Sequence, residues 1–178
     1  ELTHQDSMGT KESLGRGAIQ FMTAGTGVMH SEHNHGDKPL RFIQTWISPA
    51  QYGLKPNYGS CNGATGKNQL KHLVSDMSDS SVSTPVEINQ KVDAFASELD
   101  MGEKVSFNLP DRRQAYLLCV EGGVQVNGQS LSKYDACEIT GAGTIEIEAT
   151  SVEETEGGEV AHVLMFVMDE SPPGRTDF

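Results

Sequence analysis

The residues best suited to chemistry lie at 27–35, where the chain reads Gly-Val-Met-His-Ser-Glu-His-Asn-His. A strand over residues 28–34 would turn alternate side chains to opposite faces. One face would then carry His30, Glu32 and Asn34, and the other His33 and His35. An imidazole and a carboxylate two residues apart can share a metal ion, and this pair suits iron, manganese, nickel or zinc. A polar edge strand with solvated histidines would look the same, so His-x-Glu alone leaves both interpretations open.

Short β-type runs surround this segment and recur at intervals of about ten residues, as in an all-β sandwich or barrel. Turn residues separate them, with Asn127-Gly128 as the clearest hairpin turn. The expected strands cover residues 19–23, 40–47, 86–88, 94–99, 105–109, 115–120, 144–149 and 160–168. Only 69–73 or 89–93 could form a short helix, so the fold class is all-β.

Two polar stretches interrupt the strand pattern. Residues 49–68 are rich in Gly, Asn, Lys and Pro, and residues 75–84 are rich in Asp and Ser. Such composition is typical of loops and linkers. We therefore expect a first lobe over 1–50, a loop-rich connector over 51–84 and a second lobe over 85–178.

The charge balance excludes several classes of function. Thirteen Lys and Arg residues stand against 25 Asp and Glu residues, which gives a net charge of −12. Nucleic acids and anionic membranes both attract basic surfaces, so direct contact with either is not expected.

No apolar run is long enough to span a bilayer. Three cysteines without a Cys-x-x-Cys spacing fit a reducing, cytoplasmic setting.

Two motifs resemble known families. The spacing Gly25-x-Gly27-x2-His30-x3-Asn34 is similar to the second cupin motif, with Gly25 where cupins usually carry Pro. A longer match resembles the pirin family and covers roughly residues 3–47. It consists of His4-Gln5-Asp6-Ser7-x-Gly9, then Gln20-Phe21-Met22-Thr23-Ala24-Gly25-x-Gly27-x-x-His30-Ser31-Glu32, then the run 40–47 with Gln44 and Trp46. The resemblance implies two cupin β-barrels, the first incomplete at its N-terminus.

The same resemblance implies a metal, usually iron, in the N-terminal lobe. Pirins bind it through three His and one Glu, and His30 and Glu32 match the third His and the Glu. The first two ligands lie on an upstream His-x-His strand that is not in this sequence, and His4 matches a family His that is not a ligand. Three accounts stay open: the upstream part was cleaved or left out, a second copy supplies it by strand exchange in a homodimer, or the chain is a natural truncation.

The resemblance also implies candidate functions. Some bacterial pirins are quercetin 2,3-dioxygenases, which would make Glu32 a metal ligand or the base for the hydroxyl of a flavonol-like substrate. The alternatives are a non-enzymatic regulatory protein that binds a protein partner, or a metal-free relic that acts through its interfaces. Elsewhere we expect His72 at the surface, His162 in the core or at an edge, and Met22, Met29 and Trp46 inside the barrel.

Overall fold

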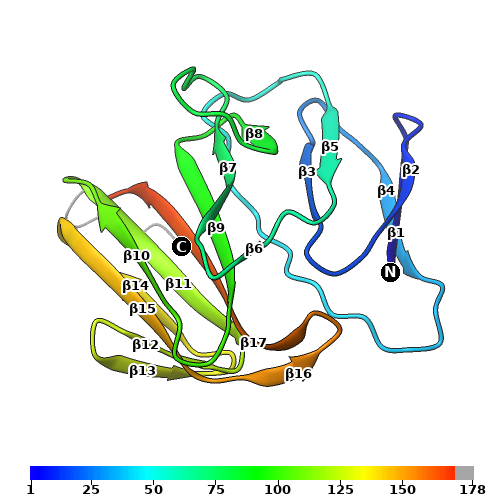
Figure 1. The fold of residues 1–178 in the computed structure, drawn as a ribbon. Helices are drawn as coiled ribbons and strands as arrows, with labels where there is room; N and C mark the ends of the chain where they lie inside the picture. Colours follow the sequence, from blue (N-terminus) through cyan, green and yellow to red (C-terminus); the bar gives the residue numbers. More distant parts are fainter. Residues whose placement is uncertain (171–178) are drawn as a thin grey trace. The chain divides into compact units, whose positions relative to one another are not determined.

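The computed structural model describes residues 1–170, which form seventeen β-strands and no helix (Figure 1). The all-β prediction is therefore confirmed. No helix in this part of the chain could cross a membrane. The strands are β1 (Leu2–Asp6), β2 (Lys11–Leu14), β3 (Ile19–Thr23), β4 (His30–Asn34), β5 (Asn57–Cys61), β6 (Gly66–Lys67), β7 (Lys71–Asp76), β8 (Val86–Ile88), β9 (Val92–Leu99), β10 (Lys104–Leu109), β11 (Arg113–Glu121), β12 (Gly123–Val126), β13 (Gln129–Ser132), β14 (Ala136–Ile139), β15 (Gly143–Ser151), β16 (Glu153–Thr155) and β17 (Gly158–Asp169).

The chain divides into two compact units. The first comprises residues 1–65 and 73–90, and the second comprises residues 66–72 and 91–178. The chain therefore passes between the units three times, whereas the composition had suggested one connector between two lobes. The boundary at 72/73 falls inside β7, so this strand belongs to both units.

The first unit contains small antiparallel sheets. One has the order β2-β1-β4, and the other pairs β3 with β5. Strand β7 also pairs with β8 in parallel register. The buried apolar side chains of this unit are few, so polar groups occupy part of its interior. The buried apolar residues are Leu2, Leu14, Ala64, Leu73, Val74 and Val86.

The second unit holds the main apolar core. One sheet has the order β10-β15-β12-β13, and in the other β14, β11, β17 and β9 lie side by side. Both sheets contribute buried side chains to one cluster, including Leu99, Leu117, Ile147, Val163 and Met165. The long strand β17 pairs with β11 and β9, as expected for a central strand.

Local sequence explains several of these elements. In β15, Ile145 and Ile147 are buried while Glu146 is exposed, so the alternation places one face on the core. Asn127 and Gly128 have φ values of 48° and 83° and connect β12 to β13. Positive φ at both central positions is what a type I′ hairpin turn requires. The predicted hairpin is therefore present.

Gly25 fixes the turn that leads towards β4. Its φ is +53°, and a Cβ added there would lie 2.1 Å from the Leu54 carbonyl oxygen. That oxygen accepts a hydrogen bond from the Thr26 backbone N–H at 2.9 Å. The position therefore requires a residue without a side chain, both for its backbone angle and for the close approach of a second segment.

The structure differs from the sequence pattern in the middle of the chain. No strand forms over 40–47, because this stretch has no hydrogen-bonded neighbour in a sheet. The stretch 51–84, interpreted as a loop-rich connector, contains β5, β6 and the whole of β7. Neither 69–73 nor 89–93 is helical, since both stretches contribute residues to strands. Within 51–84, the pairing of β5, β6 and β7 with other segments outweighs the local composition.

Two residues expected inside the barrel lie outside it. Met29 is 78% exposed and Trp46 is 86% exposed, whereas Met22 is half-buried. Met29 immediately precedes β4, and Trp46 belongs to the unpaired stretch over 40–47.

Candidate metal centre

Strand β4 presents the two expected metal ligands. It begins at His30 and runs antiparallel to β1, with Asp6 opposite His30 and His4 opposite Glu32. His30 is exposed and Glu32 is half-buried. Because they are two residues apart on a strand, both side chains project from the same face of the sheet. The strand is therefore present, although it starts two residues later than expected.

His33, Asn34 and His35 make contacts of their own, apart from His30 and Glu32. The rings of His33 and His35 stack with centroids 5.5 Å apart. The Asn34 amide donates to the Lys38 carbonyl at 2.8 Å and accepts from the Gly36 backbone N–H at 3.0 Å. Asn34 thus holds the turn that follows β4.

A chain of hydrogen bonds leads away from Glu32. The Gln20 Nε2 on β3 donates to Glu32 Oε1 at 2.5 Å. The Tyr58 hydroxyl on β5 lies 3.0 Å from Gln20 Oε1 and also contacts Glu12 Oε1 on β2. Burial and then the neighbouring Glu12 carboxylate raise the pKa of Tyr58 above its ordinary value. Its hydroxyl therefore keeps its hydrogen at neutral pH.

His4 is the most deeply buried polar residue of this group, at 1% exposure. Its ring stacks on Tyr58 with centroids 4.4 Å apart and on His30 with centroids 5.7 Å apart. The Nε2 atom lies 3.3 Å from Asp6 Oδ2. The Nδ1 atom is buried and has no hydrogen-bond partner among residues 1–170. A lone buried nitrogen of this kind indicates that the interior is built to face a further polar group.

Asp6 fixes the orientation of His4. Burial raises the pKa of Asp6, but hydrogen bonds from Thr10, His4 and Met8 together outweigh burial and leave the pKa below its ordinary value. The ionised carboxylate accepts from the Met8 and Thr10 backbone N–H groups at 2.9 and 3.0 Å. With Nε2 donating to this carboxylate, a neutral His4 ring leaves Nδ1 as an acceptor.

The donor types fit a divalent transition metal, although their number is small. Within the described 170 residues, no three His, Cys, Asp or Glu side chains are grouped closely enough to hold a metal ion. His30 and Glu32 would thus supply two donors, one imidazole and one carboxylate. The unpartnered His4 Nδ1 beside them fits a site that accommodates a further polar group, and the remaining coordination positions need donors from outside this set.

Sequence reasoning missed part of this constellation. His4, Asp6 and Gln20 lie within the stretches that resemble pirins, but His4 was matched only to a family His that is not a ligand, and no role was expected for Asp6 or Gln20. Glu12 and Tyr58 carried no signal, because only the pairing of β3 with β5 brings Tyr58 near Gln20, and Glu12 joins the group through its contact with Tyr58.

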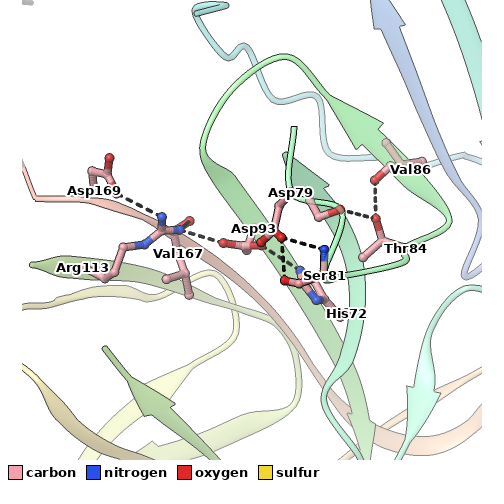
Figure 2. A network of polar contacts seen from close by, with 10 residues as sticks. His72, Asp79, Ser81, Thr84, Val86, Asp93, Arg113, Val167 and Asp169 are labelled. Atoms are coloured by element: carbon pink, nitrogen blue, oxygen red, sulfur yellow. Dashed lines mark hydrogen bonds and ion pairs between the residues drawn. The ribbon is translucent and has the colours of Figure 1, made fainter. Parts of the chain in front are cut away.

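A second polar network lies in the second unit. His72 Nε2 lies 2.9 Å from Asp93 Oδ1, and Arg113 donates to Asp93 Oδ2 at 2.7 Å (Figure 2). Arg113 also donates to Asp169 at 3.0 Å, and the His72 ring stacks on Phe95 at 4.3 Å. His72 is therefore half-buried and paired, not simply a surface residue as expected. The network ties β7, β9, β11 and β17 together.

His162 lies where the sequence predicted it, and Cys119 belongs to the core. His162 is a partly buried residue on the central strand β17, with its Nδ1 3.7 Å from Glu121. Cys119 is fully buried, and burial raises the pKa of its thiol to about 11. A buried, protonated thiol is unreactive, so Cys119 serves the core.

Comparison with known proteins identifies relatives over most of the chain. Residues 1–47 match the family described as Pirin, and residues 74–166 match the family described as Quercetinase C-terminal cupin domain. A pirin-like protein of Caulobacter vibrioides is 33% identical over 87% of this chain and 66% of its own length. The quercetin 2,3-dioxygenase of Escherichia coli K12 is 32% identical over 85% of this chain and 64% of its own length.

Solved structures of pirins from Escherichia coli superpose on this chain over most of its length. The crystal structure of YhhW from Escherichia coli superposes with a TM-score of 0.80 at 28% identity, over 99% of this chain and 69% of that protein. The structure of bacterial pirin YhhW in complex with nickel(II) superposes with a TM-score of 0.74 at 26% identity, over 96% and 69% of the two chains. The chain thus spans about two thirds of the length of these relatives.

Proposed function

Because this chain belongs to the pirin family of cupin proteins, we propose that its first unit binds a divalent metal ion and acts as a quercetin 2,3-dioxygenase-type oxygenase. His30 and Glu32 are the proposed ligands from this chain. The proposed metal is iron, with nickel, manganese and zinc as ions that the same donors accept.

One observation carries this proposal. His30 and Glu32 project from one face of β4, and Gln20 holds the Glu32 carboxylate through a hydrogen bond of 2.5 Å. Metal-binding carboxylates are commonly oriented by such hydrogen bonds. The nickel complex of a related pirin and the quercetin 2,3-dioxygenase relative support the same chemistry.

The proposed substrate is a flavonol-like aromatic molecule with acidic hydroxyl groups. When bound, a divalent metal would supply Lewis acidity, and a redox-active one such as iron would also supply reactivity toward dioxygen. His30 would bind through an imidazole nitrogen, and Glu32 would bind through its carboxylate or take the proton of the substrate hydroxyl. His30 is exposed, so a substrate can approach its imidazole from solvent.

A second candidate is a non-enzymatic protein whose metal site tunes a binding surface. The stretch 40–52 favours it, because several bulky apolar side chains are exposed there. These are Phe42, Ile43, Trp46, Ile47 and Tyr52. Such a concentration of exposed apolar groups is typical of interaction surfaces.

The experiment measures Ni²⁺ and Fe²⁺ binding by calorimetry and quercetin consumption by absorbance, for the wild type, His30→Ala and His33→Ala. His33 is the matched control, since it is also an exposed histidine of β4 but lies on the opposite face. We expect the wild type and His33→Ala to bind metal and to consume quercetin, and His30→Ala to do neither.

Two results would separate the candidates or reject both. Metal binding without quercetin consumption would replace the oxygenase with the non-enzymatic binding protein. Equal metal binding by the wild type and His30→Ala would show that the ligand assignment is wrong.

A further inference from the structure

Glu32 lies at one end of a series of hydrogen bonds between half-buried side chains of the first unit. These hydrogen bonds connect Glu32 to Gln20, Gln20 to Tyr58, and Tyr58 to Glu12, and they join strands β4, β3, β5 and β2. Neither Gln20 nor Tyr58 is a metal ligand. Their arrangement nevertheless constrains how the carboxylate can lie.

The orientation of the Gln20 amide follows from its two neighbours. A carboxylate accepts hydrogen bonds only, so the amide must turn its NH2 group towards Glu32. The reverse orientation would place two acceptor oxygens 2.5 Å apart. The amide oxygen of Gln20 then faces Tyr58, whose hydroxyl can donate to it across 3.0 Å. Both ends of the amide are thus matched in this orientation when the Tyr58 hydrogen points to Gln20 and not to Glu12.

The position of Tyr58 is in turn held from two sides. Its ring stacks on the buried His4 ring at 4.4 Å, and its hydroxyl contacts Glu12. A phenol has one hydrogen, so Gln20 and an ionised Glu12 compete for it. Tyr58 thus acts on Glu32 only through Gln20, by donating its hydrogen to the Gln20 amide oxygen.

We propose that Gln20 is the positioning residue for the Glu32 carboxylate, and that Tyr58, held by Glu12 and His4, fixes the Gln20 amide in its donating orientation. This inference rests on the proposed function, because it gives Gln20 and Tyr58 a role at the same metal site. A carboxylate held in advance loses less freedom when a metal binds. Removing such outer partners typically weakens metal binding about 10- to 100-fold.

The test measures Ni²⁺ affinity by calorimetry in the full chain, for the wild type, Gln20→Met, Tyr58→Phe and Gln5→Met. Gln5→Met is the matched control, because it makes the same exchange at an exposed position of β1. We expect Gln20→Met to weaken Ni²⁺ binding about 10- to 100-fold. We expect Tyr58→Phe to weaken it by a smaller factor and Gln5→Met to leave it unchanged.

A second readout follows the hydrogen bonds without metal. In ¹H–¹⁵N spectra, the Gln20 side-chain amide is identified as the pair of signals that disappears in Gln20→Met. We expect these signals to move in both Glu32→Ala and Tyr58→Phe and to stay in place in Gln5→Met. A role limited to local packing would not connect Tyr58 to the Ni²⁺ affinity.

The outcomes separate this inference from the proposed function. A wild type that binds no Ni²⁺ overturns both the proposed function and the metal role of Gln20. A wild type that binds Ni²⁺ with the same affinity as Gln20→Met overturns this inference alone. Amide signals that stay in place in Glu32→Ala and Tyr58→Phe also overturn it, since the chain of hydrogen bonds would not exist in solution.

Discussion

The turn at Gly25 sets the approach to β4, and Gly25→Ala tests how tightly that approach is built. The backbone there has a φ of +53°, which costs an alanine about 1–2 kcal/mol. The new Cβ would also lie 2.1 Å from the Leu54 oxygen and 2.9 Å from its carbonyl carbon. Both are backbone atoms, so one of the two segments must move.

That movement has a further cost. It strains or breaks the hydrogen bond from Thr26 to the Leu54 oxygen, which contributes about 1 kcal/mol. Together with the backbone term, Gly25→Ala should lower the free energy of unfolding by about 2–3 kcal/mol. Chemical denaturation followed by circular dichroism measures this change.

Gly53→Ala is the matched control. Gly53 also has a positive φ, of +73°, but a Cβ added there meets no atom within 4 Å. It should therefore cost only the backbone term of about 1–2 kcal/mol. Equal destabilisation by the two substitutions would refute the close approach of Gly25 to Leu54.

Three further predictions concern the second unit and the thiols. Ile147→Ala removes a fully buried side chain and should lower the free energy of unfolding by about 2–5 kcal/mol, measured by denaturation; a loss below about 1 kcal/mol would contradict its place in the core. A hydrogen bond from Asn68 lowers the pKa of Asp100 in the folded protein. The ionised Asp100 therefore stabilises the fold at pH values above the ordinary aspartate pKa, and this stabilisation is lost as the pH falls through the lowered pKa of the folded state. Unfolding across pH 2–7 should thus show the difference between the wild type and Asn68→Gly shrinking in acid, and a constant difference would contradict this. Cys119 should react with iodoacetamide only after unfolding, while the partly exposed Cys61 reacts in the native protein; mass spectrometry of labelled peptides distinguishes them, and native labelling of Cys119 would contradict its burial.

Local sequence predicted the elements whose partners are near in the chain. The Asn127-Gly128 turn joins adjacent strands, and the alternation of Ile145 and Glu146 reports a sheet with one buried face. The stretch 40–47 shows the limit of this reasoning. Its apolar residues suggested a strand, but a strand requires a neighbour, and the sequence does not state which segment provides one.

At the candidate site, too, local sequence predicted some residues and missed others. His30 and Glu32 could be found because they are two residues apart on one strand. The support of Glu32 could not, because Gln20 and Tyr58 are 38 residues apart in the chain and meet only through the pairing of β3 with β5. The register of that pairing is a property of the folded unit, and no local pattern encodes it.

The most direct test of the central claim is to locate the metal. Crystals of this chain grown with Ni²⁺ and measured at the nickel absorption edge would show its position by anomalous scattering. We expect an anomalous nickel peak about 2.0–2.2 Å from an imidazole nitrogen of His30 and from a carboxylate oxygen of Glu32. A peak between His33 and His35, or no peak in the first unit, would contradict it.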